Sequence, residues 1–530
     1  MERGTRELDS TDKIVAILTA ILVLGAIAIR LYVLYFPFSF YSYLVPPGGD
    51  AANHLVSIKN AGAWQFSGGY PPFFHLLAYY FSQLFFGGNL VEGLKWLTPA
   101  MVVLPSIAVY IFLKKNFSTR AAIFGFFIAI FTANYGLIAY ADGNYPNILA
   151  AGFFMPIALS YIVKAFSEQR RKNIFYALVF LSLTILTHHF TTALFILIAI
   201  TFLLTMAIYN AFRGKSTKSM KIISLLIGLL VLVAVGIYLS PAKEMFVNAY
   251  NNFKTSGTFF GDPSFIQPIE QAEYPFQVGF LPWFFGLAGI IFLLTKLNRA
   301  ESEKKTFPAI LLILVWFFVL FAFSRTSASG LPGRVARETG IPLILASAVM
   351  LSSFVEMCSH KLQRNLVYGV FGFFVAINLI QVNAGSFRAP DFFNNMIWFD
   401  SADLAKANEM NKISEIKRLF TNNSTPYLKF FLDKDLIPIG LEAVKTPRDL
   451  AVAAQTYDVG YLYLGKKTAS LPNEDVYPEF QNFTKLYKAI ESACQQACTA
   501  KKTFSDGSVL YQIKSVKAVE SATSSSSTKH

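Results

Sequence analysis

Carboxylates, histidines and arginines occur where the long apolar runs of this sequence end. The carboxylates are Asp50, Asp142 and Glu270, and the histidines and cations are His54, His188, His189, Arg334 and Arg337. A carboxylate can take the proton of an attacking hydroxyl group, and cations can hold the charge that develops on a leaving phosphate. Because apolar runs adjoin these residues, they suit the transfer of a group from a lipid-linked phosphate.

Each of these residues also has a structural interpretation, which the sequence leaves open. Asp50, in Gly48-Gly49-Asp50-Ala51, is a suitable N-cap for a helix, and His54 follows it by one turn. Asp142-Gly143 satisfies ordinary turn chemistry, and Glu270 in a long loop can be a solvated charge. Histidines at a helix end are often structural, and arginines near a membrane surface extend their long side chains towards water.

The composition is that of a membrane protein. Of the 530 residues, 54% are apolar and 15% are charged, whereas a soluble domain needs a more polar surface. Apolar runs that could cross a bilayer, which takes roughly 20 residues, recur up to residue 383 and number about eleven. We place them near residues 14–36, 96–113, 121–140, 146–166, 174–187, 190–211, 221–240, 277–295, 307–324, 340–358 and 366–383.

Basic residues lie in alternate connections between these runs, as at Lys114, Arg170 and Lys304. This is the positive-inside pattern, which predicts a cytoplasmic N-terminus and a C-terminal domain outside a cell membrane. It also separates residues 174–187 from 190–211 as two spans that turn outside at His188 and His189. The net charge of +14 therefore reflects membrane topology, and no nucleic-acid partner is expected.

Residues 1–383 form the predicted transmembrane domain, with long outer loops at residues 37–95 and 241–276. The first loop has Pro and Gly breakers around two helical stretches, of which the first begins at Asp50. The second stretch, 73–86, is apolar. Counting it as a span would place the basic loops outside, so we expect it to lie along the membrane interface. Arg30 is the one charge clearly within a span, and it is near enough to the outer end to reach water.

Residues 384–516 predict a small extracytoplasmic α/β domain. Thr446-Pro447 opens a helix, residues 459–464 and 508–514 alternate like strands, and Asp506-Gly507 marks a turn. Cys494 and Cys498 could pair in an oxidising compartment. Three residues begin Asn-x-Ser/Thr triplets that could carry glycans, namely Asn422, Asn423 and Asn482. Residues 517–530 are Ser-rich and predict a disordered tail.

In these features the sequence resembles the GT-C superfamily of membrane glycosyltransferases. Those enzymes share an aspartate in the first outer loop, which Asp50 matches, and they use lipid-phosphate sugar donors. The order of the later motifs is similar to that in the catalytic subunit of oligosaccharyltransferase. Tyr70-Pro71 precedes an interfacial helix, Asp142-Gly143-Asn144 looks like the second acidic motif, Pro268-Ile269-Glu270 like the glutamate motif, and Arg334 or Arg337 before Pro342 like the arginine span.

The resemblance implies an α-helical polytopic membrane protein with a GT-C-like fold, in which the corresponding carboxylates hold a divalent metal. Asp50, Asp142 and Glu270 would then be metal ligands, and their hard oxygen atoms suit Mg²⁺ or Mn²⁺. Two features depart from oligosaccharyltransferase. Asn144 replaces a second carboxylate, and the outer domain lacks the WWDYG motif that reads the acceptor sequon, for which Ile397-Trp398-Phe399-Asp400 is a poor substitute.

The sequence therefore predicts an enzyme that moves a sugar from a polyprenyl-phosphate donor to a glycan, lipid or protein acceptor at the outer face of the lipid membrane. Asp50 is the expected general base, with Asp142 and Glu270 in support, and the donor phosphate is expected to bind Arg334 or Arg337 with His188 or His189. The alternatives are oligosaccharyltransferase-like transfer to protein, a lipid transporter, and a non-catalytic envelope scaffold. A transporter should have broken spans in paired halves, which the sequence does not display.

Overall fold

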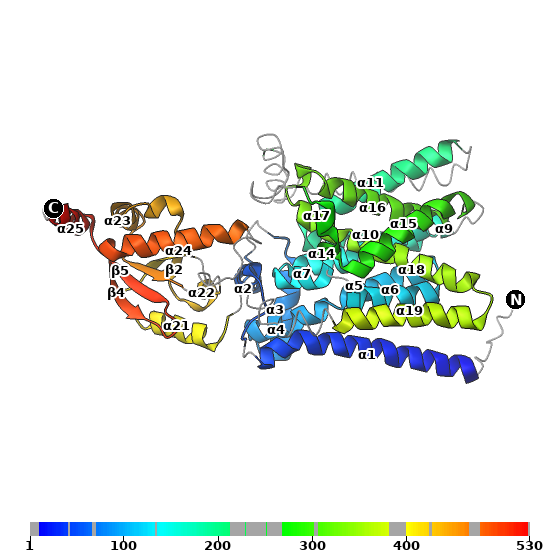
Figure 1. The fold of residues 1–530 in the computed structure, drawn as a ribbon, viewed down its shortest axis with the longest axis horizontal. Helices are drawn as coiled ribbons and strands as arrows, with labels where there is room; N and C mark the ends of the chain where they lie inside the picture. The colour runs from blue at the N-terminus through cyan, green and yellow to red at the C-terminus, as the bar shows by residue number, and fades with distance from the viewer. Residues whose placement is uncertain are drawn as a thin grey trace. The chain divides into compact units, whose positions relative to one another are not determined.

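The structure of the protein is a computed structural model that describes residues 10–40, 43–65, 70–132, 135–212, 268–300, 306–380, 399–422, 427–465 and 478–527, together with Gly228 and Asn251. The chain divides into two compact units (Figure 1). We call residues 1–37 and 57–389 the helical unit, and residues 38–56 and 390–530 the sheet unit. The division differs from the predicted domain boundary because residues 38–56 group with the C-terminal residues.

Helices make up the described part of the helical unit. From the N-terminus they are α1 (Ser10–Phe40), α2 (Gly49–Gly62), α3 (Phe73–Phe86), α4 (Leu90–Met101), α5 (Leu104–Asn116), α6 (Thr119–Thr132), α7 (Tyr135–Ala141), α8 (Tyr145–Leu149), the π-helical turn η1 (Ala150–Phe154), α9 (Met155–Glu168), α10 (Arg171–Thr187) and α11 (His189–Phe212). After residue 268 come η3 (Gln271–Glu273), α14 (Tyr274–Val278), α15 (Phe280–Ala300), α16 (Phe307–Ser324), η4 (Ser327–Ser329), α17 (Pro332–Glu338), α18 (Gly340–Met357) and α19 (Lys361–Ile380). The C-terminal end of α1 and the first part of α2 belong to the sheet unit.

Within the described residues, 8 helical stretches are long and apolar enough to cross a membrane. They are Thr19–Ser39, Leu90–Asn116, Thr119–Ala141, Tyr145–Glu168, His189–Phe212, Phe280–Leu297, Phe307–Ser324 and Pro332–Met357. The chain is therefore a multi-pass α-helical membrane protein, as predicted. Of the other predicted spans, 174–187 matches α10, which has 17 residues, and 366–383 overlaps α19, but neither helix is among the 8. The run 221–240 lies outside the described residues except for Gly228.

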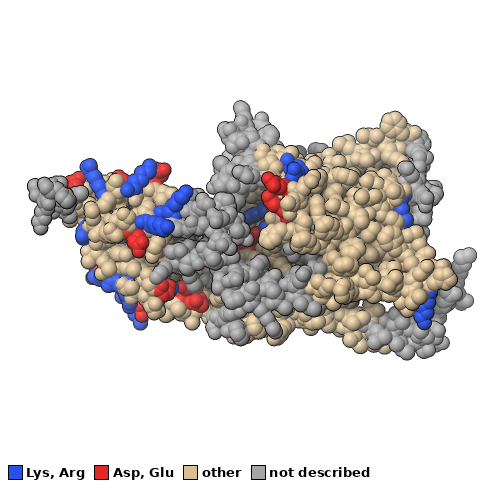
Figure 2. All heavy atoms as spheres, in the orientation of Figure 1, with Lys and Arg blue, Asp and Glu red and all other residues tan. Residues whose placement is uncertain are grey.

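The exposed surface of the helical unit suits lipid. In Figure 2 the described atoms of its visible face are mostly tan with a few blue and red spheres, whereas more blue and red spheres are spread over the face of the sheet unit. Large apolar side chains on that surface are highly exposed, for example Leu84 at 78%, Phe212 at 87% and Leu362 at 80%. The predicted interfacial helix is α3, whose 14 residues extend about 21 Å, less than the roughly 30 Å of a hydrocarbon core. Its place at the interface stays a prediction.

Close packing of α15 on α18 fixes the position of the polar end of the unit. A Cβ atom on Gly289 of α15 would lie 2.5 Å from the carbonyl carbon of Ala346 on α18, and one on Gly286 would lie 2.6 Å from Leu343. Small residues allow this approach, which favours helix association where lipid weakens the hydrophobic drive. Because α17 and α18 form one candidate span, this contact also positions α17.

A side chain at Gly289 should therefore separate α15 from α18. We expect Gly289→Val to destabilise the purified chain by about 1–3 kcal/mol, because overpacking displaces backbone rather than a flexible side chain. Thermal unfolding in detergent measures the effect. Gly369→Val is the matched control, since nothing lies within 4 Å of a Cβ atom on that residue of α19. Similar losses of stability in the two variants would contradict the packing role.

The sheet unit is a mixed sheet covered by helices. Its strands are β1 (Arg418–Thr421), β2 (Asp435–Pro438), β3 (Tyr461–Leu464), β4 (Cys498–Thr503) and β5 (Val509–Ile513), in the order β2-β1-β3-β5-β4. β1 pairs in parallel with β2 and β3, and β5 is antiparallel to β3 and β4. The helices are α21 (Ser401–Asn411), α22 (Leu428–Phe431), η6 (Leu441–Val444), α23 (Pro447–Thr456), α24 (Pro478–Ala497) and α25 (Val516–Ser527). Leu450, Leu462 and Ile490 meet in its core, so helix and strand faces bury one another.

Several local predictions in this unit are confirmed. Thr446 caps α23 through a capping box with Asp449, the hairpin of β4 and β5 turns at Asp506-Gly507, and Cys494 and Cys498 form a disulfide with Cα atoms 4.5 Å apart. Two others need correction. The predicted disordered tail, 517–530, is helical up to Ser527, because Val519 is buried against α23 and α24.

The second correction concerns the glycan acceptors. The Asn422 side chain is buried and exchanges two hydrogen bonds with Gly465, of 2.9 and 3.1 Å, so it holds β1 to the end of β3 instead of facing water. Asn423 lies outside the described residues, and so does the side chain of Asn482, which is part of α24. Ile397 and Trp398, from the segment compared with the WWDYG motif, also lie outside the described residues. Asp400 of the same segment caps α21.

The segment before Asp50 is held within the sheet unit by backbone contacts. Leu44 N–H donates to the carbonyl oxygen of Phe399 at 2.9 Å, and Tyr43 forms an isolated antiparallel bridge with Asp400. The buried Tyr427 hydroxyl donates to the carbonyl oxygen of Pro46. These contacts fix the chain entering α2, so the helix that begins beside Asp50 is positioned by C-terminal residues far away in the sequence.

A buried ion cluster ties α21 to the β4–β5 hairpin. The Lys406 ammonium lies 2.7 Å from Asp403 Oδ1 and 2.6 Å from Asp506 Oδ2, and Asp403 is only 1% exposed. Burial alone would raise the pKa of Asp506, but hydrogen bonds from Lys406 and Ser508 outweigh it and lower that pKa. A lowered carboxyl pKa stabilises the fold above the ordinary value of about 4, and this stabilisation is lost as the pH falls through the folded-state pKa.

We therefore expect Lys406→Met to destabilise the sheet unit by about 3 kcal/mol, because it leaves the Asp403 carboxylate buried and unpaired. Hydrogen exchange of the full chain at pH 7 should accelerate at the amides of β4 and β5. Acidification below about pH 4 should accelerate it in the wild type. The control is Lys445→Met, which removes an exposed pair with Glu442 and should change nothing measurable. Unchanged exchange in Lys406→Met would contradict the cluster's role.

Candidate active site

Asp142 lies in a tight turn that the local sequence dictates. Gly143 has a φ of 78°, its N–H donates to Tyr140 O at 3.1 Å, and Asn144 N–H donates to Ala139 O at 2.8 Å. These bonds form a Schellman ending for α7, which favours Gly because only Gly takes a positive φ without strain. Pro146 lies in the first turn of α8, where its missing N–H costs no helical hydrogen bond. The turn joins two candidate spans and presents Asp142 at their end.

Arg337 of α17 pairs with this turn. Its Nη1 donates to Asp142 Oδ2 at 2.7 Å, and the Arg337 side chain is 9% exposed against 44% for Asp142. Pro332 begins α17, so Arg334 and Arg337 both lie on a helix. Arg334 and Arg337 are three residues apart on that helix and so share a face. The ion pair brings together two of the predicted site residues.

Glu338 is a third charged residue here, and the sequence analysis missed it. Its side chain is 2% exposed, and neither carboxylate oxygen has a hydrogen-bond partner of good geometry among the described residues. The Asn147 amide is near enough to interact with it as a weak hydrogen-bond donor, and Arg334 and Arg337 act on it electrostatically. A buried ionisable group within a candidate span is a functional candidate by default. Its position in the sequence could have indicated it, because Glu338 directly follows the candidate residue Arg337 and comes just before the apolar run of α18.

His188 connects to this cluster through polar side chains. His188 Nδ1 lies 2.9 Å from Thr191 Oγ1, which in turn donates to Asn147 Oδ1 at 2.7 Å. The chain breaks helical form at His188, between α10 and α11, as predicted. Because the Asn147 oxygen accepts from Thr191, its NH₂ group is the part left to act on Glu338. The turn between α10 and α11 is thus joined to the turn that holds Asp142.

Aromatic rings surround the two histidines. The ring of Tyr70 lies 6.2 Å from His188 and 5.8 Å from His189, and it also meets His75 of α3 edge-on at 6.1 Å. Burial lowers the pKa of His75 to about 4, although a backbone hydrogen bond with Pro71 opposes this, so His75 is neutral at pH 7. Arg334 acts electrostatically on His189. Tyr70 therefore lies beside all three histidine rings, in the region on which the Arg334 cation acts.

The loop with Glu270 is anchored to the same helices. Ile269 N–H donates to Ser324 O at 3.1 Å, and the Arg325 guanidinium donates to the Ile269 carbonyl. The Tyr274 hydroxyl is hydrogen-bonded to Ser324 Oγ, and α14 packs on α17. Glu270 itself is exposed and begins η3 without a capping bond. Arg325 is thus committed to holding this loop.

Asp50 and His54 belong to the sheet unit. Asp50 lies in the first turn of α2 as predicted, partly buried, with Gly48 before it at a φ of 105°. His54 is fully buried one turn later. A first-turn carboxylate is favoured by the helix dipole, which accounts for the residue type without a catalytic role. Because α2 already begins at Gly49, Asp50 lies inside the helix and is not its N-cap, and the general-base role stays a hypothesis.

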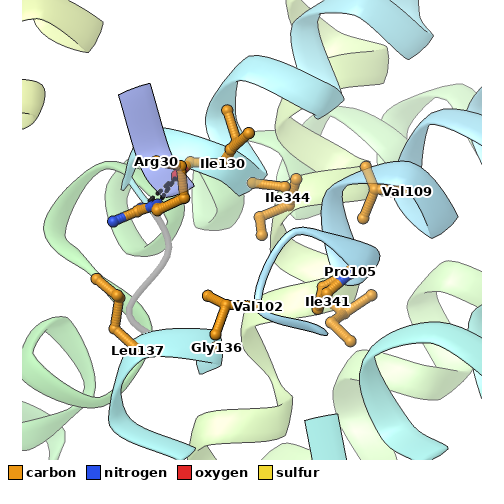
Figure 3. A pocket seen from close by; sticks show the side chains of 10 residues that line it. Arg30, Val102, Pro105, Val109, Ile130, Gly136, Leu137, Ile341 and Ile344 are labelled. Carbon is orange, nitrogen blue, oxygen red and sulfur yellow. Dashed lines mark hydrogen bonds between the residues drawn. The ribbon is translucent and has the colours of Figure 1, made fainter. Parts of the chain in front are cut away.

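The prediction that Arg30 reaches water is wrong. It is 2% exposed and donates to the carbonyl oxygen of Ile130, near the C-terminal end of α6, where carbonyls lack helical partners. Figure 3 shows its side chain directed at Ile130 beside a cavity of about 10 Å³, roughly the room of one water molecule. The cavity is otherwise lined by Val102, Pro105, Val109, Ala129, Gly136, Leu137, Ile341 and Ile344. Arg30 therefore has a structural role.

The predicted metal ligands do not fit a metal site in the described structure. Among the described residues, no group of three or more His, Cys, Asp and Glu side chains is placed to hold an ion. Asp142 Oδ2 is engaged by Arg337 at 2.7 Å, a contact that a cation would have to displace, and Glu270 is exposed on its loop. No step proposed below passes through Mg²⁺ or Mn²⁺.

A membrane-protein family described as "6-pyruvoyl-tetrahydropterin synthase related domain; membrane protein" matches residues 69–336. That range contains Asp142, Glu270, both histidines and Arg334, and it ends one residue before Arg337. A search of curated protein sequences finds no match.

Three solved GT-C glycosyltransferases have a similar fold, which confirms the predicted fold. The oligosaccharyltransferase of Archaeoglobus fulgidus has a TM-score of 0.63 at 13% identity, over 94% of this chain and 74% of that chain. ArnT of Cupriavidus metallidurans has 0.55 at 16%, over 95% and 98%. The arabinofuranosyltransferase AftD from Mycobacteria has 0.54 at 13%, over 93% and 41%. Other structures of the first two enzymes contain dolichol-phosphate with an inhibitory peptide, Zn with sulfate, or undecaprenyl phosphate.

The pair of Arg337 and Asp142 should couple the end of α7 to α17. In a double-mutant cycle of Arg337→Met and Asp142→Asn, we expect a coupling free energy of about 1 kcal/mol, because one partner is buried and the other half-exposed. Thermal unfolding of the full chain measures it. The control cycle uses Arg120 and Glu356, which are 3.4 Å apart with both side chains exposed, and should give additive effects. Additivity in the first cycle would contradict the coupling.

Proposed function

The chain belongs to the membrane-protein family described as 6-pyruvoyl-tetrahydropterin synthase related, and we propose that it is a glycosyltransferase with a polyprenyl-phosphate-linked sugar donor. The observation that carries the proposal is the gathering of Arg334, Arg337 and the two histidines at one end of an apolar helical bundle with the GT-C fold. The fold favours sugar transfer over the pterin chemistry that the family description names. We propose the outer membrane face as its location.

The proposed reaction replaces one bond at the anomeric carbon by another. A hydroxyl group of the acceptor attacks that carbon from the face opposite the phosphate, and the bond from carbon to phosphate oxygen breaks, so the configuration inverts. Asp50 takes the proton of the attacking group as general base. The polyprenyl phosphate leaves with an additional negative charge, and Arg334, with its neighbour His189, is suited to hold it. Asp142 orients Arg337, and Glu270 is proposed to act at the acceptor side.

Apolar surroundings suit such a donor. The polyprenyl tail needs a lipid-facing path, and the exposed surface of the helical unit is apolar. Low dielectric near the helices also strengthens the attraction between a guanidinium and a phosphate. Arginine suits this role better than lysine, because its planar donors match phosphate oxygens in pairs.

Transfer to protein is the second candidate, and one observation favours it. The Archaeoglobus oligosaccharyltransferase has the higher TM-score of the structures compared, and one of its structures holds an acceptor peptide with an NVT sequon. The absence of WWDYG from the sequence speaks against sequon recognition. A sequon peptide added to the transfer assay separates the two, because only the oligosaccharyltransferase-like reaction glycosylates it.

A transporter is less well supported. Its charged groups should line a path near mid-membrane. Arg30, the candidate for such a role, is bonded to a backbone carbonyl beside a cavity with room for a single water molecule.

Purified protein in lipid nanodiscs should transfer sugar from a dolichyl-phosphate-linked hexose to acceptors in a membrane extract, measured as release of dolichyl phosphate. We expect Asp50→Asn to lower the turnover by at least about a hundredfold, because removal of a general base costs this much. Asp433→Asn is the matched control on the exposed surface of the same unit. A wild-type rate in Asp50→Asn would remove Asp50 from the mechanism. No transfer by the wild type from any polyprenyl-phosphate sugar would contradict the proposed function itself.

A further inference from the structure

Several buried polar groups around the turn of Asp142 lack hydrogen-bond partners of good geometry among the described residues. They include both polar side-chain atoms of Asn144, the Nε of Arg337 and both carboxylate oxygens of Glu338. Asn144 is fully buried, Glu338 is 2% exposed and Arg337 is 8% exposed. In folded proteins such groups are rare, and each one calls for an explanation by a ligand, a water molecule or a functional role.

These groups lie in one neighbourhood. The ion pair of 2.7 Å between Arg337 and Asp142 brings α17 against the turn that continues into Asn144. One helical turn beyond Asn144, the amide of Asn147 acts on the carboxylate of Glu338. The unpartnered atoms are therefore grouped along two short segments that contact each other, residues 142–147 and 337–338.

Their chemistry selects the kind of ligand. Arg337 Nε–H and the Asn144 NH₂ group are donors, whereas the Asn144 oxygen and the Glu338 oxygens are acceptors. An inorganic anion would satisfy the donors and leave the acceptors unpaired. A cation would do the reverse. A ring that carries several hydroxyl groups satisfies both, because each hydroxyl both donates and accepts.

We propose that Asn144, Arg337 and Glu338 form a subsite for the sugar ring of the lipid-linked donor. The assignment rests on the proposed function, because it supposes a sugar-phosphate ligand, and it adds which residues distinguish the sugar from the lipid phosphate. Arg334 lies on the same face of α17 and acts on both Glu338 and His189, so phosphate and sugar would bind to successive turns of one helix. Asn144, where oligosaccharyltransferase has a second carboxylate, is then a sugar-binding residue instead of a metal ligand.

Binding of two matched lipids tests the assignment in the full-length protein. The probes are dolichyl phosphate and dolichyl phosphate linked to glucose or mannose, with affinity measured in nanodiscs. We expect Glu338→Gln and Asn144→Ala to weaken binding of the sugar-linked lipid about ten- to a hundredfold, because buried partners of its hydroxyls are lost. Binding of bare dolichyl phosphate should change less than about threefold, since its contacts remain. Glu356→Gln, on the exposed far end of α18, is the matched control and should alter neither affinity.

Stability distinguishes this role from a structural one. If the carboxylate of Glu338 binds a ligand and has no structural role, Glu338→Met should raise the Tm of the ligand-free protein by roughly 2–4 °C. The reason is that the substitution removes an unsatisfied buried carboxylate. If bound water satisfies Glu338 as part of the fold, the same change should lower the Tm. The sugar-linked lipid should raise the Tm of the wild type and no longer raise that of Glu338→Met.

Other outcomes would overturn the subsite. Equal weakening of both lipids would make these residues structural, and unchanged binding of both would exclude them. An effect on the KM of the acceptor alone would move them to the acceptor. Equal affinity of the wild type for bare and sugar-linked lipid would also exclude the subsite. Because binding is measured without turnover, a protein that selects the sugar-linked lipid through Glu338 but transfers nothing would contradict the proposed reaction and leave the subsite intact.

Discussion

A guanidinium group buried among apolar helices has to find oxygen atoms to donate to, and this requirement organises the helical unit. Arg337 meets it with the Asp142 carboxylate and Arg30 with the end of α6, while the exposed Arg325 makes a similar contact with the carbonyl of Ile269. Each contact joins segments far apart in the sequence at a point where a helix ends. The turn of Asp142 is therefore held against α17, because Arg337 would otherwise be left buried and unpaired.

The same requirement separates structural from functional charges. Arg30 and Arg325 donate to backbone oxygens, which have no other use in these places. Glu338 and the Nε of Arg337 have no such partner among the residues that the structure describes, and they adjoin the histidine turn of α11 through Asn147 and Thr191. Unsatisfied polar groups destabilise a fold, so their concentration at one end of the bundle is best explained by a ligand that completes them.

Much of the fold could be predicted from the sequence. The apolar runs predicted a multi-pass helical protein, the basic loops placed a turn at His188, and Thr446-Pro447 predicted a capped helix, because these features depend on neighbouring residues alone. The site was less predictable. Asp142 and Arg337 were both candidates, but their pairing follows from the close packing of Gly289 on α18 and from a turn nearly two hundred positions earlier. Glu338 was overlooked because, beside Arg337, it had the pattern of a solvated charge. Nor could local patterns predict that Tyr427 holds Pro46 in the segment before Asp50.

The central claim is that the polar end of the helical unit binds a sugar linked to a polyprenyl phosphate. A structure of the protein in nanodiscs with a non-transferable dolichyl-phosphate sugar analogue would test it most directly. Our account predicts phosphate density beside Arg334 and His189, with the sugar ring within hydrogen-bond distance of Asn144 and Glu338. Analogue density at another place on the protein, with Glu338 bonded to water or to a protein group, would contradict it.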